Sequence, residues 1–157
     1  MLRVFAGLAA LAVGATLVVA QNLDAIKQRQ DAMDTIAKPG LEAFKMLKGE
    51  LPFDLAKVQA ALKTYQEQGA KLKTLFPDDS KTGGDTDAQP KIWQARAEFD
   101  KALDGFITTA RNAAAAIKDE ASFKAEYPAV TKTCGECHKS SDGFSPSLSE
   151  SMKRVPK

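Results

Sequence analysis

Apolar residues recur at spacings of three and four along most of this chain, and this pattern constrains the fold more than any other feature. Such a spacing places the apolar side chains on one face of an α-helix. Four segments show it, at about residues 23–47, 55–75, 92–117 and 122–134. No segment shows the period-two alternation of a half-buried strand. The sequence therefore predicts an all-α fold, an antiparallel up-down-up-down four-helix bundle.

Prolines, glycines and one capping residue refine this prediction. Lys38-Pro39-Gly40 predicts a kink in the first helix or its division into two, because proline lacks the N–H that an interior helical residue donates. Asp54 is the predicted N-cap of the second helix. Residues 77–90 form the longest predicted loop, and Pro128 weakens the first turn of the last helix.

The N-terminal residues have a different composition from the rest of the chain. Residues 1–20 contain a single charge, Arg3, followed by an almost wholly apolar run. This is the pattern of a signal peptide cleaved after Ala20; the alternative is an uncleaved membrane anchor, since the run is near the lower limit for a membrane span. We expect cleavage, export to a bacterial periplasm without stable membrane insertion, and one mature domain over residues 21–157.

The charge balance and the scarcity of reactive residues exclude several classes of function. Lys and Arg together number 22 and Asp and Glu 20, which is too even for a dedicated nucleic-acid binder. A protein partner must therefore dock through a local patch rather than by long-range attraction. One His and two Cys are too few for a zinc site of four protein ligands or for several disulfides.

The chemically distinctive residues are gathered in one motif, Cys134-Gly135-Glu136-Cys137-His138. Side chains three positions apart on a helix point the same way, so two thiols can reach the two vinyl groups on one edge of a haem. The imidazole at the next position is then directed at the iron. C-x-x-C-H is the attachment pattern of c-type haem, so we predict one haem c bound through two thioethers.

Three other interpretations of the motif are open. A thioredoxin-type dithiol needs a strand–helix context, which this sequence lacks. A structural disulfide between the two cysteines leaves the adjacent histidine unexplained. A zinc site lacks further Cys or His ligands.

A C-x-x-C-H motif in the last helix of a four-helix bundle resembles the class II c-type cytochromes, the cytochrome c-prime family. Three other stretches are similar to that family: Arg29–Met33, Gly49–Asp54 and Gly83–Trp93. Together the similarities run from about Ile26 to His138, which is nearly the whole mature chain.

The resemblance implies a role for each matching residue. Cys134 and Cys137 carry the thioethers, and His138 is the proximal iron ligand. Arg29 lies beside the haem and pairs with a propionate; the alternative is a solvent-facing arginine. Trp93 packs near the haem edge or belongs to the ordinary core.

The segment after the motif departs from the family. Members commonly have an aromatic residue and an arginine within a few residues of the histidine, whereas residues 139–143 here are Lys-Ser-Ser-Asp-Gly. A short segment is expected around Leu148–Met152. Lys153 and Arg154, which follow it, are expected to replace the basic side chain that family members have after the histidine.

Two functions from different classes follow from the resemblance. One is a one-electron carrier, in which a protein ligand occupies each face of the iron. The other is a protein that binds or scavenges nitric oxide or carbon monoxide at an open sixth position. An enzyme is disfavoured, because the only histidine is used as an iron ligand. Many members also pair into homodimers through their first helices.

Met33 distinguishes the two functions. It lies four residues after Arg29, one turn further along the same helix face. In low-spin relatives this position is Met, and in gas-binding relatives it is an apolar residue that leaves the iron five-coordinate. Met46 faces away from this side of the helix, and Met152 lies in the tail. We therefore predict low-spin iron with His138 and Met33 as axial ligands, and electron transfer to redox partner proteins as the function.

Overall fold

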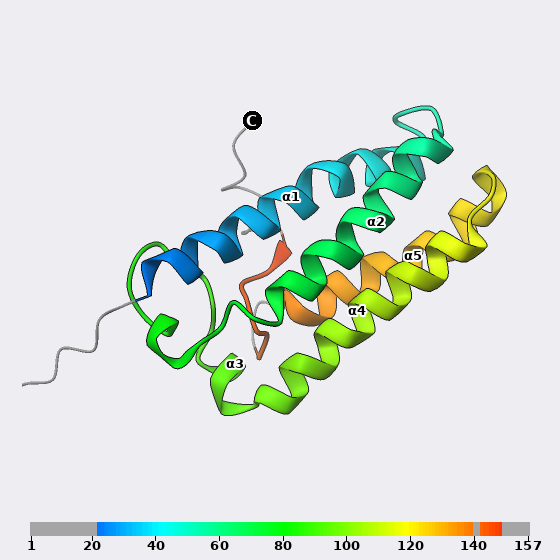
Figure 1. Ribbon diagram of the computed structural model, residues 1–157. Coiled ribbons are helices and arrows are strands. Elements are labelled where there is room, and N and C mark those ends of the chain that lie inside the picture. Colours follow the sequence, from blue (N-terminus) through cyan, green and yellow to red (C-terminus); the bar gives the residue numbers. More distant parts are fainter. Residues whose placement is uncertain (1–21, 140–141, 149–157) are drawn as a thin grey trace, which may run out of the picture.

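The computed structural model describes residues 22–139 and 142–148, and most of these residues are helical (Figure 1). The elements in chain order are α1 (Leu23–Leu47), α2 (Leu55–Leu72), the 3-10 turn η1 (Asp78–Ser80), α3 (Lys91–Gln94), α4 (Arg96–Ala116) and α5 (Glu120–Cys137). Helix α2 packs against α1 and α4, and α4 packs against α5. The predicted four-helix bundle is confirmed, with α1, α2, α4 and α5 as its helices.

Polar side chains cap the starts of three bundle helices. At the start of α1 the Asn22 side-chain oxygen accepts a hydrogen bond from the Ala25 N–H. The Asp54 carboxylate accepts a hydrogen bond from the Lys57 N–H at 3.1 Å, so the predicted N-cap of α2 is confirmed. At the start of α5 the Asp119 carboxylate accepts from the Ser122 N–H, and the Ser122 hydroxyl accepts from the Asp119 N–H. This reciprocal pair satisfies N–H groups that a helix end leaves without partners.

Neither proline inside a helix divides it. Helix α1 continues through Pro39, so the predicted alternative of two shorter helices is wrong. Buried side chains lie on both sides of Pro39, and one apolar face therefore joins the two halves of the helix. A Cβ at Gly40 would lie 3.0 Å from the Tyr65 hydroxyl, so a glycine here allows α1 and α2 to approach closely. Helix α5 likewise continues through Pro128.

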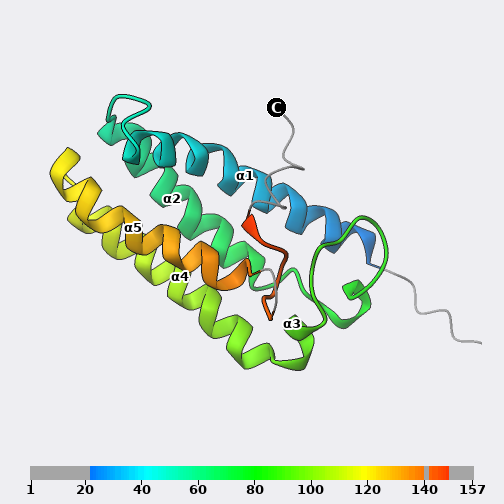
Figure 2. The ribbon, with the colours of Figure 1, turned by 180° about the vertical axis from the view of Figure 1, so that it is seen from behind.

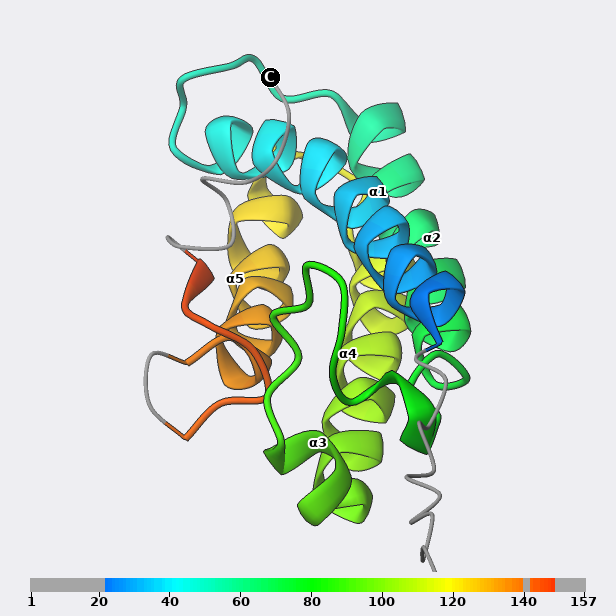
Figure 3. The same cartoon turned by 90° about the vertical axis from the view of Figure 1, so that its left-hand side faces the viewer.

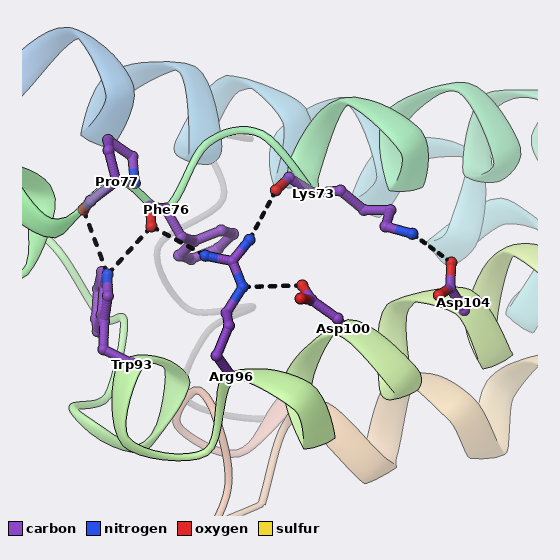
Figure 4. A network of polar contacts seen from close by, with 7 residues as sticks. All are labelled: Lys73, Phe76, Pro77, Trp93, Arg96, Asp100 and Asp104. Atoms are coloured by element: carbon purple, nitrogen blue, oxygen red, sulfur yellow. Dashed lines mark hydrogen bonds and ion pairs between the residues drawn. The ribbon is translucent and has the colours of Figure 1, made fainter.

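The third predicted helix is divided at Ala95, where φ is −125° and ψ is 51°. Figure 4 shows the contacts around this break. The Trp93 indole N–H lies 3.2 Å from the Phe76 carbonyl, and Arg96 donates to the carbonyls of Phe76 and Lys73 at 3.2 and 3.0 Å. The prediction of one continuous helix was wrong, because side chains on both sides of the break bind carbonyls in the segment after α2.

The buried side chains form two cores. The first core lies among the four bundle helices: Ala43, Met46, Val58, Ala61, Leu62, Tyr65, Phe106, Ala110, Ala113, Ile117, Phe123, Tyr127 and Val130. The second core includes residues of the loops and of the tail: Ala32, Leu72, Leu75, Phe76, Ile92, Phe99, Leu103 and Phe144. Cys134 packs against the first core and Cys137 against the second, so the motif lies where the two cores meet.

Two sequence predictions concern parts of the chain outside the described residues. The first is the signal peptide predicted at residues 1–20. The second is the short segment predicted around Leu148–Met152, with Lys153 and Arg154, of which only Leu148 is described. In residues 22–139 and 142–148, no helix is long and apolar enough to span a membrane.

Two tyrosine hydroxyls meet inside the first core and provide a test of its packing. Tyr65 and Tyr127 are each 3% exposed, and their oxygens lie 2.8 Å apart. Burial raises the pKa of both tyrosines, that of Tyr127 to about 12, so both hydroxyls keep their protons. Each therefore depends on its neighbour for a hydrogen bond.

We expect Tyr65→Phe to lower the free energy of unfolding by about 1–3 kcal/mol, because the Tyr127 hydroxyl then loses its partner in the core. Replacing both tyrosines with phenylalanine should recover most of this loss, since no buried hydroxyl then remains. Urea denaturation of the haem-bound protein measures both values. A double variant that is no more stable than Tyr65→Phe would contradict this account.

Candidate haem site

The C-x-x-C-H motif occupies the last turn of α5 and the residue after it. Cys137 is the final helical residue, and His138 follows as the C-cap with φ −97° and ψ 81°. Both cysteines are half-buried free thiols. Their spacing of one turn places the two thiols near each other on α5, while the imidazole begins the segment that leaves the helix.

Burial keeps both thiols protonated in the polypeptide before haem is attached. It is the main cause that raises the pKa of Cys134 to about 11, and it also raises the pKa of Cys137. The two sulfur atoms are therefore neutral near pH 7. Thiols on one helical turn beside apolar cores suit bond formation with the vinyl edge of a haem.

The His138 ring is held in a defined orientation. Its Nδ1 lies 3.1 Å from the Pro146 carbonyl oxygen. A carbonyl can only accept a hydrogen bond, so this contact requires the proton on Nδ1 and makes Nε2 the basic nitrogen. Burial lowers the pKa of His138, an effect that the Pro146 hydrogen bond and the charge of Asp87 oppose. A neutral imidazole is the form that binds iron.

Met33 lies on the same side of the bundle as Cys137. Met33, Trp93 and Cys137 all pack against the second core, where Met33 comes from α1 and Cys137 from α5. Of the neighbouring bundle helices, α1 and α5 make the least direct contact with each other. Met46, the competing methionine, is buried in the first core, and Met152 lies outside the described residues.

Arg29 is buried, so the alternative interpretation of a solvent-facing arginine is wrong. Its side chain is 5% exposed. Nη1 donates to the Leu75 carbonyl and the Ser80 hydroxyl, and Nη2 donates to the Ser80 carbonyl and the Thr86 hydroxyl, all between 2.9 and 3.2 Å. Its guanidinium also lies 4.7 Å from the centre of the Phe76 ring. Arg29 therefore fastens the segment after α2 and the long loop to α1.

The residues that lie beside the motif after His138 were not predicted from the sequence. Phe144 is buried, its ring lies 5.3 Å from that of Phe99, and its N–H donates to the Cys137 carbonyl at 3.0 Å. Phe144 is thus an aromatic residue close to the motif, further along the chain than in the family pattern. The Asp142-Gly143 dipeptide was the readable signal of a turn here.

Comparison with known proteins identifies the family. The Cytochrome C' family profile matches residues 24–140. This chain belongs to the cytochrome c' family. A cytochrome c' of Rhodopseudomonas palustris is 45% identical over 127 residues, which are 81% of this chain and 82% of that protein. A cytochrome c-556 of the same species is 36% identical over 142 residues, covering 88% and 95%.

A solved structure supports the same assignment. The cytochrome c' structure from Rhodopseudomonas palustris matches with a TM-score of 0.74 and 42% identity, covering 80% of this chain and 98% of that one. Members of this family are electron-transfer haem proteins with one covalent c-type haem. The donors described above fit that cofactor: two neutral thiols on one helical turn, and an imidazole whose basic nitrogen is Nε2.

The hydrogen bonds of Arg29 predict a stability effect in this cytochrome. Lysine is also charged but has no planar fork, so Arg29→Lys cannot replace bonds that reach Leu75, Ser80 and Thr86 together. We expect the free energy of unfolding to fall by about 1–3 kcal/mol. Arg111→Lys, at an exposed position on α4, is the matched control and should change it by less than about 0.5 kcal/mol. Equal urea midpoints for the two variants would contradict the role of Arg29.

Proposed function

We propose that this cytochrome is a one-electron carrier whose iron has His138 and Met33 as axial ligands. Cys134 and Cys137 are the residues that we assign to the two thioethers. The observation that carries the proposal is the position of Met33, which packs from α1 against the same core as Cys137 at the end of α5. When bound, the haem supplies a ferric–ferrous couple for one-electron transfer.

The chemistry of methionine favours this function. A thioether ligand opposite an imidazole stabilises ferrous iron and raises the reduction potential. Met33 is partly exposed rather than locked in the interior, and its unbranched side chain has several rotatable bonds. Met46 is only 4% exposed and is packed among the helices of the first core, whereas Met33 and Cys137 both pack against the second core.

We assign Arg29 a place beside a haem propionate. Its contacts to the loop use Nη1 and Nη2, so Nε is the atom through which we expect it to donate to a carboxylate. In this proposal one guanidinium both fastens the long loop and neutralises a charge of the cofactor.

The alternative function is the binding or scavenging of nitric oxide or carbon monoxide by five-coordinate iron. One observation favours it: the cytochrome c' named above is more similar to this chain than the cytochrome c-556 is. In this alternative, Met33 fills the second core and does not bind iron. Neither function requires an enzyme active site.

We place the mature protein, residues 21–157, in the periplasm after removal of the leader. Its nearly balanced charge supports docking to redox proteins through a local patch. Leu41 and Phe44 are 40% and 38% exposed on α1, an apolar surface that suits pairing of two copies through this helix.

The attachment of the haem can be tested by mass. The intact mature protein should exceed its polypeptide mass by one haem, and acidic acetone should fail to extract the colour, because thioethers are covalent. Cys137→Ala should keep at most one thioether and melt at a lower temperature than the unmodified protein. A mass equal to that of the bare polypeptide would end the assignment of Cys134 and Cys137.

The axial ligand can be tested with a matched pair of methionine variants. Met33→Leu should convert the iron to high spin and allow carbon monoxide to bind readily, because the sixth position loses its thioether. Met46→Leu should leave the spin state unchanged, since Met46 belongs to the first core. Visible spectra of both oxidation states, with and without carbon monoxide, measure this. If Met33→Leu leaves them unaltered, Met33 is not a ligand.

A further inference from the structure

The segment 142–146 turns back beside the C-terminal end of α5 after the motif (Figures 2 and 3). We call it the proximal loop. Ser145 forms a parallel bridge with His138, and the next residue, Pro146, places its carbonyl oxygen 3.1 Å from the His138 Nδ1. The residue before a proline is restricted to extended conformations, which matches the position of Ser145 in a bridge.

Several hydrogen bonds hold the proximal loop in place. The N–H groups of Phe144 and Ser145 both donate to the Cys137 carbonyl, at 3.0 and 3.2 Å. The Phe144 carbonyl accepts from the Gln89 N–H at 3.0 Å, and the Asp142 carbonyl accepts from the Lys91 ammonium at 2.9 Å. The loop is therefore fastened both to the end of α5 and to the start of α3.

The backbone of the loop depends on a glycine. A Cβ on Gly143 would lie 2.7 Å from the Lys139 nitrogen, 2.8 Å from the Lys139 oxygen and 2.9 Å from the Ser145 oxygen. All three are backbone atoms, which cannot move away as a flexible side chain can. Asp142 has a φ of 67°, so the turn also uses a left-handed residue just before Gly143.

We propose that the proximal loop tunes the iron through His138, because the Pro146 carbonyl accepts a hydrogen bond from the Nδ1–H and holds the ring in one orientation. A histidine whose Nδ1–H is bound in this way is a more basic ligand through Nε2. A more basic ligand stabilises ferric iron, so the loop lowers the reduction potential. Pro146 is thus a positioning residue, and its role rests on the proposed function of His138 as an iron ligand.

The single histidine makes this contact directly observable. Labelling histidine with ¹⁵N gives the two ring-nitrogen signals of one imidazole, Nδ1 and Nε2, which can be recorded in the reduced protein under carbon monoxide. Ferrous iron is diamagnetic there, whether the sixth ligand is Met33 or the gas. We expect the Nδ1 proton to exchange slowly with water in the unmodified protein.

Gly143→Ala forces the proximal loop to move and is the main test variant. We expect it to speed exchange of the Nδ1 proton by roughly tenfold, the factor expected for the loss of one net hydrogen bond. The reduction potential should shift to a more positive value. Gly105→Ala is the matched control, because a Cβ on Gly105 has no atom within 4 Å. It should change neither quantity.

A second pair of variants avoids dependence on a strained backbone. Phe144→Ala removes the ring that packs against Phe99 and should shift exchange and potential in the same direction as Gly143→Ala. Phe144→Leu keeps an apolar side chain there and should restore values close to those of the unmodified protein.

The failures of the two proposals are distinguishable. Loop variants that speed proton exchange without raising the potential, or that change neither quantity, would overturn the tuning role of the loop. A ¹⁵N signal of His138 without the shift of an iron-bound ring would instead refute the proposed function.

Discussion

The position at which α5 ends is the constraint on which the site depends. Cys137 is the last helical residue, and its carbonyl accepts hydrogen bonds from the N–H groups of Phe144 and Ser145. These bonds satisfy an acceptor that a helix end leaves without an intrahelical partner. Because the helix ends there, the two thiols stay on a regular turn while His138 turns towards the proximal loop.

The two cores support this end of α5 in different ways. The first core joins residues of all four bundle helices and contains a satisfied pair of tyrosine hydroxyls, so it fixes how the helices pack. The second core combines helix residues with loop and tail residues. Arg29 connects the long loop, residues 77–90, to α1 by hydrogen bonding to Ser80. The bundle helices thus position the site, and loops supply much of its surroundings. Loops are the part of a fold in which sequence and function vary most within a family.

Local patterns in the sequence were sufficient to predict the fold and the haem motif. The helix segments follow from apolar spacing, and the N-cap at Asp54 follows from a short acidic side chain before an apolar run. The break at Ala95 and the burial of Arg29 could not be predicted in this way. Their partners lie far along the chain: Trp93 binds the Phe76 carbonyl, and Arg29 binds residues of the long loop. The proximal loop was missed for the same reason, since it depends on contacts with α5 and α3.

The central claim is that Met33 closes the sixth position of an iron held by His138. Electron paramagnetic resonance of the unmodified ferric protein tests it most directly, because the signal reports the spin state that the two axial ligands impose. A thioether opposite an imidazole predicts a low-spin signal. A high-spin signal from the unmodified protein would contradict the account and assign Met33 to the second core and the protein to gas binding.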